Sequence, residues 1–199
     1  DQTPATTPTS ICLLIPTYNN VQTITDVVGG CLESGLPVMV VDDGCTDGTS
    51  ERLNEALEKG ITLVRHDQNR GKGQALMSGF LRALADGYSH VITIDADGQH
   101  RPEEIPRFVQ AIGEHPEAMI LGVRDLRGSG RRRKSRLLRL HSNFWVKAET
   151  GTWLQDTQTG YRAYPMAAID ELHLACGKYD FEIEVLVKFM WAGGQVEHV

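Results

Sequence analysis

The chain has 199 residues, enough for one domain with a substantial core, and its formal net charge is −6. That balance argues against a nucleic-acid partner, but eight basic residues and a single acid lie between Arg124 and Arg139, so we expect a local anionic partner. No stretch approaches the ~20 apolar residues that span a bilayer. The four cysteines form no CxxC pair, which favours a reducing, cytoplasmic setting.

The two ends of the chain differ from the rest. Residues 1–10 are rich in Thr and Pro and lack the apolar centre of a signal peptide, so we expect a disordered lead-in. Residues 195–199 resemble a strand that has only begun, which suggests a chain cut from something longer. We therefore expect one domain over residues 11–199, truncated at its C-terminus.

Short apolar runs alternate with helical patterns from residue 11 onward. Strands are predicted at 11–16, 37–41, 61–64, 90–94 and 118–123. Helices are predicted at 23–33, 47–59 and 71–85, and from Pro102 onward. Strict alternation with short connections predicts an α/β fold, a single Rossmann-like domain with a mostly parallel central sheet flanked by helices.

The alternation breaks after residue 123. The basic segment leads into a predicted helix at about 134–149, then a polar loop at 156–162 and a strand-like pair at 163–164. Two further helices are predicted, at 167–175 and 179–192. We interpret the three tryptophans, Trp145, Trp153 and Trp191, as core or packing residues. Glu182 and Glu184 are interpreted as part of a solvated helix face.

Polar clusters follow five of the predicted strands. They are residues 17–19, 42–43, 66–70, 95–97 and 124–125. In an open α/β sheet, ligands bind outside the carboxyl ends of the strands. The sequence therefore predicts one site at this edge of the sheet.

The segment from Thr93 to His100 points to a metal. Asp95 and Asp97 are spaced i and i+2 at the end of an apolar strand, which puts both carboxylates on one face. With the amide oxygen of Gln99 they form a ligand set that Mg²⁺ or Mn²⁺ prefers, and such a metal commonly holds a diphosphate. The alternative is a turn with two solvated acids.

Other phosphate-binding patterns are absent or ambiguous. There is no GxxxxGK[ST] motif and no GxGxxG after the first strand. Asp42 and Asp43 either accept hydrogen bonds from a base or ribose or form a turn and helix cap. Asp156 and Arg162 either pair with each other or face the pocket, with Arg162 on a phosphate and Asp156 as acceptor or base. The basic segment is either a solvated loop, a cover for the metal site or a contact for anionic lipid headgroups.

Six motifs occur in order along the chain. They are IPTYN, VVDDGCTDGT, NRGKGQAL, DADGQHRPEEIP, GVRD and DTQTGYRAYP. This pattern resembles the family 2 glycosyltransferases with the GT-A fold. The last two motifs are similar to those of the dolichol-phosphate mannosyltransferase-like branch, which includes bacterial polyprenyl-phosphate sugar transferases. No QxxRW-type motif is present, unlike the processive polysaccharide synthases of the same family.

The resemblance implies a role for each matching position. Residues 11–123 would form the nucleotide-sugar half and residues 124–199 the acceptor-side half. Asp97 and Gln99 would hold the divalent metal, and Arg124 and Arg136 would meet the phosphates of donor and lipid acceptor. The nucleotide sugar would contact Pro16, Tyr18, Asp42, Asp43, Lys72, Asp95 and Arg162.

The expected activity is an inverting, metal-dependent transfer of a sugar from a nucleotide-diphosphate donor to a polyprenyl phosphate. The enzyme would be peripheral at the inner face of the membrane. If the acceptor is a hydroxyl of a sugar, lipid or small molecule, a base is needed and Asp156 is the candidate. A non-catalytic module that binds a nucleotide or headgroup is the third alternative.

Overall fold

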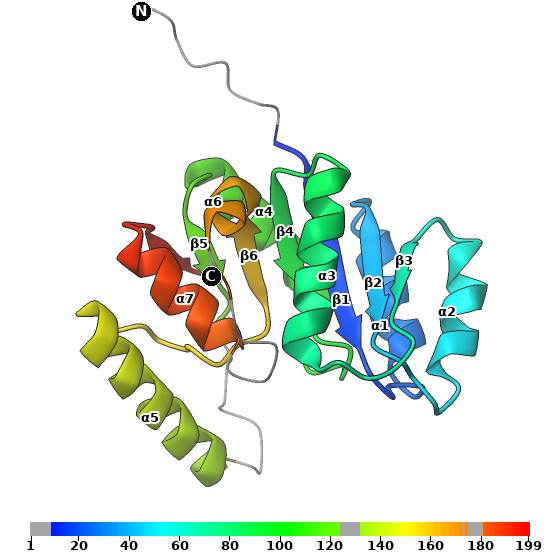
Figure 1. The fold of residues 1–199 in the computed structure, drawn as a ribbon, viewed down its shortest axis with the longest axis horizontal. Helices are drawn as coiled ribbons and strands as arrows, with labels where there is room; N and C mark the ends of the chain where they lie inside the picture. Colours follow the sequence, from blue (N-terminus) through cyan, green and yellow to red (C-terminus); the bar gives the residue numbers. More distant parts are fainter. Residues whose placement is uncertain (1–8, 124–131, 173, 175–180) are drawn as a thin grey trace, which may run out of the picture.

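The computed structural model describes residues 9–123, 132–172, 174 and 181–199, which form an α/β domain around one central sheet (Figure 1). In the described residues the sheet has seven strands in the order β3-β2-β1-β4-β6-β5-β7. They are β1 (Ile11–Thr17), β2 (Val38–Asp42), β3 (Thr62–Arg65), β4 (His90–Thr93), β5 (Met119–Leu121), β6 (Arg162–Pro165) and β7 (Val196–His198).

The pairing confirms the mostly parallel sheet. β1 pairs in parallel with β2 and β4, β2 with β3, and β5 with β7. β6 is the exception, because it runs antiparallel to both of its neighbours, β4 and β5. The strand that follows the polar loop is therefore inserted between two strands of the first half of the chain.

Helices cover both faces of the sheet (Figure 1). One core cluster contains residues of α1, α2 and α4, and the other contains residues of α3, α5, α6 and α7. The bounds are α1 (Ile24–Glu33), α2 (Thr49–Leu57), α3 (Lys72–Ala85), α4 (Ile105–Glu114, after a 3₁₀ turn at Pro102–Glu104), α5 (Arg132–Thr150), α6 (Met166–Glu171) and α7 (Phe181–Trp191).

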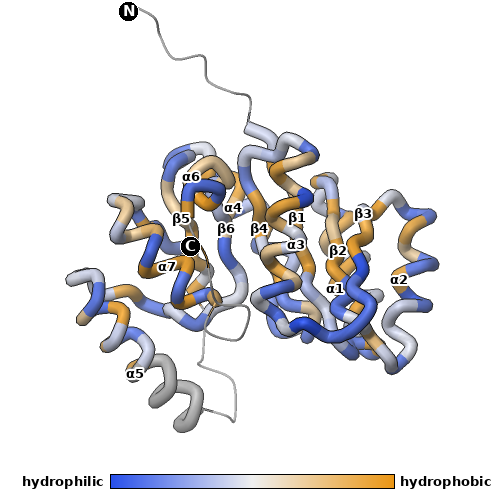
Figure 2. The backbone as a smooth tube through the Cα atoms, viewed as in Figure 1, coloured by the Kyte–Doolittle hydropathy of each residue, from blue (hydrophilic) through white to orange (hydrophobic). Residues whose placement is uncertain are grey.

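Alternation along the strands feeds the two cores. In β1, Leu13 and Ile15 belong to one cluster and Cys12 and Leu14 to the other, as the two-residue period of a strand requires. Figure 2 shows the apolar content along the central strands, whereas the loop from β3 into α3 is hydrophilic. Apolar packing on both faces thus stabilises the sheet, and the polar residues at one edge of the sheet are available to form a site.

Two sequence predictions need correction. The three tryptophans are not core residues, because the exposed fractions of Trp145, Trp153 and Trp191 are 53%, 51% and 62%, although each contacts a neighbouring residue. The helix expected at 167–175 is shorter, since α6 ends at Glu171. Residues 1–8 of the expected lead-in lie outside the described residues. In the part of the chain that is described, no helix is long and apolar enough to cross a membrane.

Candidate functional site: a polar pocket at the carboxyl ends of β1 and β4

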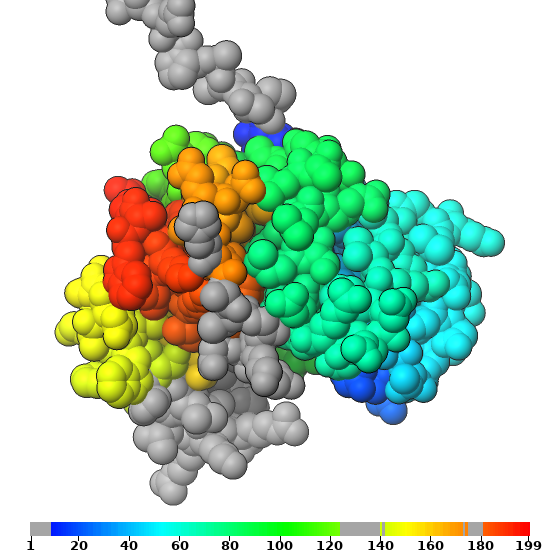
Figure 3. Space-filling model, viewed as in Figure 1, coloured from blue at the N-terminus to red at the C-terminus, as the bar shows by residue number. Residues whose placement is uncertain are grey.

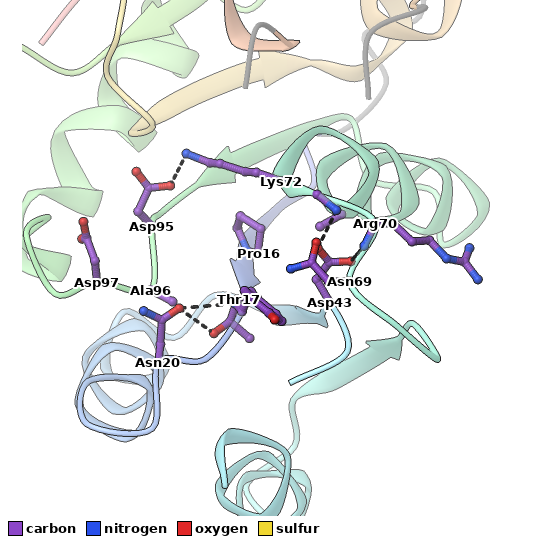
Figure 4. A pocket seen from close by; sticks show the side chains of 13 residues that line it. Pro16, Thr17, Asn20, Asp43, Asn69, Arg70, Lys72, Asp95, Ala96 and Asp97 are labelled. Atoms are coloured by element: carbon purple, nitrogen blue, oxygen red, sulfur yellow. Dashed lines mark hydrogen bonds and ion pairs between the residues drawn. The ribbon is translucent and has the colours of Figure 1, made fainter. Parts of the chain in front are cut away.

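A pocket of about 620 Å³ opens at the carboxyl ends of β1, β2 and β4, beside the first turn of α3 (Figure 4). The chain order reverses here, because β1 is flanked by β2 on one side and β4 on the other. Such switch points are where open α/β sheets bind ligands. The lining residues are Pro16, Thr17, Tyr18, Asn20, Asp43, Asn69, Arg70, Gly71, Lys72, Ala75, Asp95, Ala96 and Asp97.

Asp43 organises the turn into α3. Its Oδ1 accepts the N–H of Arg70 and its Oδ2 that of Gly71, both at 2.9 Å, and Nδ1 of His66 lies 2.6 Å from Oδ1. Gly71 has a φ of 94°, a conformation that favours glycine. The carboxylate therefore lies at the pocket but is occupied by protein donors, and it fixes the end of α3 whose dipole favours an anion.

Asp42, which the resemblance places near the nucleotide base and ribose, is the last residue of β2. It is buried and is not among the lining residues of the pocket. Its carboxylate accepts hydrogen bonds from Ser50 Oγ at 2.6 Å and from the N–H of Cys45 at 2.9 Å, and Arg65 lies 3.6 Å away. Burial alone would raise the pKa of Asp42, but these hydrogen bonds and the nearby arginine lower it. Asp42 thus stabilises the loop after β2.

Lys72 joins the two halves of the chain. Its Nζ lies 2.6 Å from Oδ1 of Asp95, which follows β4, and 2.7 Å from Oε1 of Glu182 on α7. The exposed fractions of the three side chains are 27%, 24% and 14%. Figure 4 shows Lys72 reaching across the pocket to Asp95. The cation therefore lies between a carboxylate that follows β4 and a carboxylate on α7.

Burial and neighbouring charges have opposite effects on the pKa values of Lys72 and Asp95. Burial alone would lower the pKa of Lys72, but the charges of Asp95 and Glu182 outweigh it and raise the pKa above its ordinary value. Burial alone would raise the pKa of Asp95, but the hydrogen bond from His100 and the charge of Lys72 lower it. Lys72 and Asp95 are therefore charged at neutral pH.

A second layer supports Asp95. Nε2 of His100 lies 3.5 Å from its Oδ2, and the ring of Tyr161 packs edge-on against His100 with centroids 5.2 Å apart. Gly160 lies directly against the carboxylate, so that a Cβ at this position would collide with Asp95. Thr93 Oγ1 donates to the carbonyl of Gly160 at 2.7 Å, which holds the glycine in place.

Asp97 and Gln99 are the expected metal ligands, and they lie side by side. Both are exposed, and the N–H of Gln99 donates to Oδ1 of Asp97 at 2.9 Å, which orients the carboxylate. Asp95 is occupied by Lys72, so the two acids do not form a joint cage. In the described ranges, no group of three or more His, Cys, Asp or Glu side chains could hold a metal. One carboxylate and a neighbouring amide fit Mg²⁺ or Mn²⁺, which keep waters and take ligands from a diphosphate.

Arg162 does not line the pocket and holds backbone instead. It is fully buried, and its guanidinium donates to the carbonyls of Thr159 at 2.7 Å, Glu182 at 2.7 Å and Thr157 at 2.9 Å. A planar fork with its donors engaged in this way ties the polar loop to the start of α7. These bonds give Arg162 a structural role, and its expected phosphate contact stays a prediction.

The remaining expected residues divide into three groups. Asp156 is fully buried, and its Oδ1 accepts the N–H of Gln158 at 3.2 Å. Arg124 lies outside the described residues, and so does the side chain of Arg136 on α5. Pro16 and Tyr18 line the pocket as expected, and Tyr18 is half exposed at its mouth.

Sequence reasoning missed two participants. Glu182 was expected on a solvated face, yet it is largely buried against Lys72. His100 stands in the quoted DADGQH stretch but had no assigned role. His100 follows Gly98 by two residues, so its position after this turn could be inferred from the sequence. No short sequence pattern, in contrast, connects Glu182 with Lys72.

Comparison with known proteins shows the family to which this chain belongs. Residues 12–172 match the family described as Glycosyl transferase family 2. The chain belongs to this family, and it is a glycosyltransferase domain.

Two curated relatives resemble it over most of its length. An undecaprenyl-phosphate mannosyltransferase of Micrococcus luteus is 26% identical over 200 residues, covering 95% of this chain and 81% of the relative. A polyprenol monophosphomannose synthase of Mycolicibacterium smegmatis is 30% identical over 186 residues, covering 87% of this chain and 69% of the relative.

A solved structure shows the same fold. The mannosyltransferase PcManGT from Pyrobaculum calidifontis, in complex with GDP-Man and Mn²⁺, superposes with a TM-score of 0.65 at 20% identity. The match covers 98% of this chain and 55% of that one. The GT-A fold implied by the motifs is confirmed.

Proposed function

We propose that this protein transfers a sugar from a nucleotide-diphosphate donor to a polyprenyl phosphate at a membrane surface, with inversion at the anomeric carbon. The observation that carries the proposal is the polar pocket at the carboxyl ends of β1 and β4, with Asp97 exposed at its edge. The acceptor class is supported by the relatives that are named for undecaprenyl phosphate and polyprenol monophosphomannose.

The donor diphosphate lies in this proposal between Asp97 and the first turn of α3. Asp97 and Gln99 would hold Mg²⁺ or Mn²⁺, and the bound metal would supply Lewis-acid stabilisation of the charge that develops on the leaving diphosphate. The N–H groups fixed by Asp43 at the start of α3 favour the same anion. Lys72 adds a charged ammonium at the wall of the pocket.

The acceptor side favours a phosphate over a hydroxyl. A polyprenyl phosphate oxygen is already anionic, so it can attack the anomeric carbon without a general base. A hydroxyl acceptor needs a base, and the expected candidate, Asp156, is fully buried and already accepts a backbone hydrogen bond. In this proposal Arg124 and Arg136 meet the phosphates of donor and lipid acceptor, because guanidinium forks bind phosphate oxygens bidentately.

The test is a transfer assay with labelled GDP-mannose and UDP-N-acetylglucosamine, each offered with Mg²⁺ or Mn²⁺. Undecaprenyl phosphate and its dephosphorylated alcohol serve as a matched acceptor pair. We expect label to move only to the phosphate and the product to be cleaved by mild acid, as a glycosyl phosphate is. Equal transfer to the alcohol, or an acid-stable product, would contradict the proposal and restore the hydroxyl-acceptor alternative.

A further inference from the structure

All three tryptophans of the chain are exposed and lie around one helix. Exposed tryptophan is uncommon, because its large apolar surface usually packs inside a protein. Two further large apolar side chains on the same helix are also exposed, Leu140 at 45% and Phe144 at 58%. We call this set the aromatic face. It consists of Leu140, Phe144, Trp145, Trp153 and Trp191.

The aromatic face is an ordered surface. Phe144 and Trp145 pack edge to face with ring centroids 5.7 Å apart. Nζ of Lys147 lies 5.7 Å from the ring centroid of Trp153, and Nε1 of Trp191 donates to the carbonyl of Glu149 at 2.9 Å. The rings of Trp153 and Trp191 thus contact residues in the last turns of α5, while both side chains remain exposed to solvent.

The helix that carries most of this face, α5, has apolar side chains on its exposed side as well as on its buried side. α5 packs against α7 and buries Asn143 and Val146 on its inner side, while Leu140 and Phe144 lie on the outside. In Figure 3 the yellow surface of α5 lies at the rim of the molecule beside the red surface of α7. The outer side therefore has the apolar side chains that a helix of a soluble domain normally turns inward.

The charge of α5 limits the kind of partner that can bind the aromatic face. α5 contains six basic residues and one acid, whereas the whole chain carries −6. A second copy would bring another basic helix against this one, and like charges repel. Basic residues together with exposed tryptophan and phenylalanine are typical of helices that lie in the interface of an anionic bilayer.

We propose that the aromatic face of α5 is a docking surface for anionic lipid bilayers. The choice of a bilayer rests in part on the proposed lipid-phosphate acceptor. α7 connects the surface to the site, since Glu182 in its first turn contacts Lys72 and Trp191 is its last residue. At about 1.5 Å per residue the two lie about 14 Å apart along the helix, so that docking would hold the pocket close to the headgroups.

Intrinsic fluorescence tests the proposal directly, because every tryptophan of the chain belongs to the aromatic face. The probes are vesicles of phosphatidylcholine containing phosphatidylglycerol and vesicles of phosphatidylcholine alone, both without polyprenyl phosphate. We expect a blue shift and co-flotation with the anionic vesicles. No binding to them, or equal binding to both kinds, would overturn the proposal.

Matched variants locate the contact. Phe144→Ser with Trp153→Ser removes two exposed rings, and we expect binding to the anionic vesicles to weaken by about tenfold or more. Leu57→Ser with Leu81→Ser removes two exposed apolar side chains from α2 and α3 and should bind like the wild type. Circular dichroism and GDP or UDP binding verify that both variants are folded.

Two outcomes would overturn the proposal at this stage. One is equal vesicle binding by the two double variants. The other is a concentration-dependent dimer that Phe144→Ser abolishes, since the face would then be a contact between copies of the chain. Because vesicle binding is measured without donor or acceptor, its result is independent of whether sugar transfer is observed.

Discussion

At the scale of single residues, the central feature is the position of Lys72 between two carboxylates from distant parts of the sequence. Asp95 follows β4 and Glu182 is in the first turn of α7, and each lies within 2.7 Å of the same ammonium. All three side chains are more than two-thirds buried, so each charge depends on the others for its compensation. Removing the cation would leave two like charges facing each other.

Lys72→Met should therefore destabilise the protein, by about 1–3 kcal/mol in the free energy of unfolding. The measurement is urea unfolding, with Lys59→Met as the control, because Lys59 is exposed in the turn after α2. Adding Glu182→Gln to Lys72→Met should restore part of the loss, since one of the two uncompensated charges is removed. A Lys72→Met variant as stable as the control would contradict this account.

The sequence predicted some of these residues and missed others for physical reasons. Asp95 and Asp97 lie in a short motif just after β4, and Lys72 is the first residue of the helix that follows β3, so local patterns place all three at this edge of the sheet. Arg162 and Glu182 depend on how β6 and α7 return to that edge. A buried arginine that binds carbonyls and a pocket arginine look the same in sequence, because only tertiary contacts distinguish them.

At the scale of elements, the loop before β6 determines how Asp95 is held. β6 pairs antiparallel with β4, with Thr93 opposite Arg162, and this register brings Gly160 against the carboxylate of Asp95. Local propensity predicted a strand near residues 163–164 but neither its neighbours nor its direction. Strand pairing between distant segments is set by packing, which no short window of sequence contains.

Gly160→Ala should displace Asp95, because the new methyl group would occupy the space of the carboxylate. We expect the affinity for GDP or UDP with Mn²⁺ to fall by about tenfold, which corresponds to about 1.4 kcal/mol. Calorimetric titration measures it. Gly113→Ala is the control, since a Cβ at Gly113 in α4 meets nothing within 4 Å. If both variants bound the nucleotide equally well, Gly160 would have no part in positioning Asp95.

His90 at the start of β4 predicts a pH dependence of stability. It is buried, its Nε2 donates to the carbonyl of Pro116 at 2.7 Å, and burial lowers its pKa despite that bond. The unfolded chain takes up a proton near the ordinary value of about 6.5, whereas the folded imidazole resists it. Stability should therefore be highest above that pH and should fall as the pH drops below it.

Urea unfolding at a series of pH values between neutral and mildly acidic tests this expectation. His90→Gln should show a shallower loss of the free energy of unfolding on acidification than the wild type. His115→Gln, at an exposed position, should keep the wild-type slope. An unchanged slope in His90→Gln would show that other groups account for the dependence.

At the scale of the whole molecule, residues from late in the chain support a pocket whose lining comes from residues 16–97. The ends of β1, β2 and β4 supply lining residues, whereas Glu182 pairs with Lys72 and Gly160 lies against Asp95. The alternation of strands and helices predicted the α/β class and a mostly parallel sheet, but not the place of β6 within it. The exposed aromatic face was not predicted, because a tryptophan pattern on a helix does not reveal which side meets the core.

The central claim is that Asp97 orients a divalent cation that binds the donor diphosphate. Calorimetric titration of GDP and UDP, with and without Mn²⁺, into the wild type and Asp97→Asn tests it most directly. We predict that Mn²⁺ strengthens binding to the wild type at least about tenfold and that Asp97→Asn loses this gain while remaining folded. Equal enhancement by Mn²⁺ in both proteins would contradict the account.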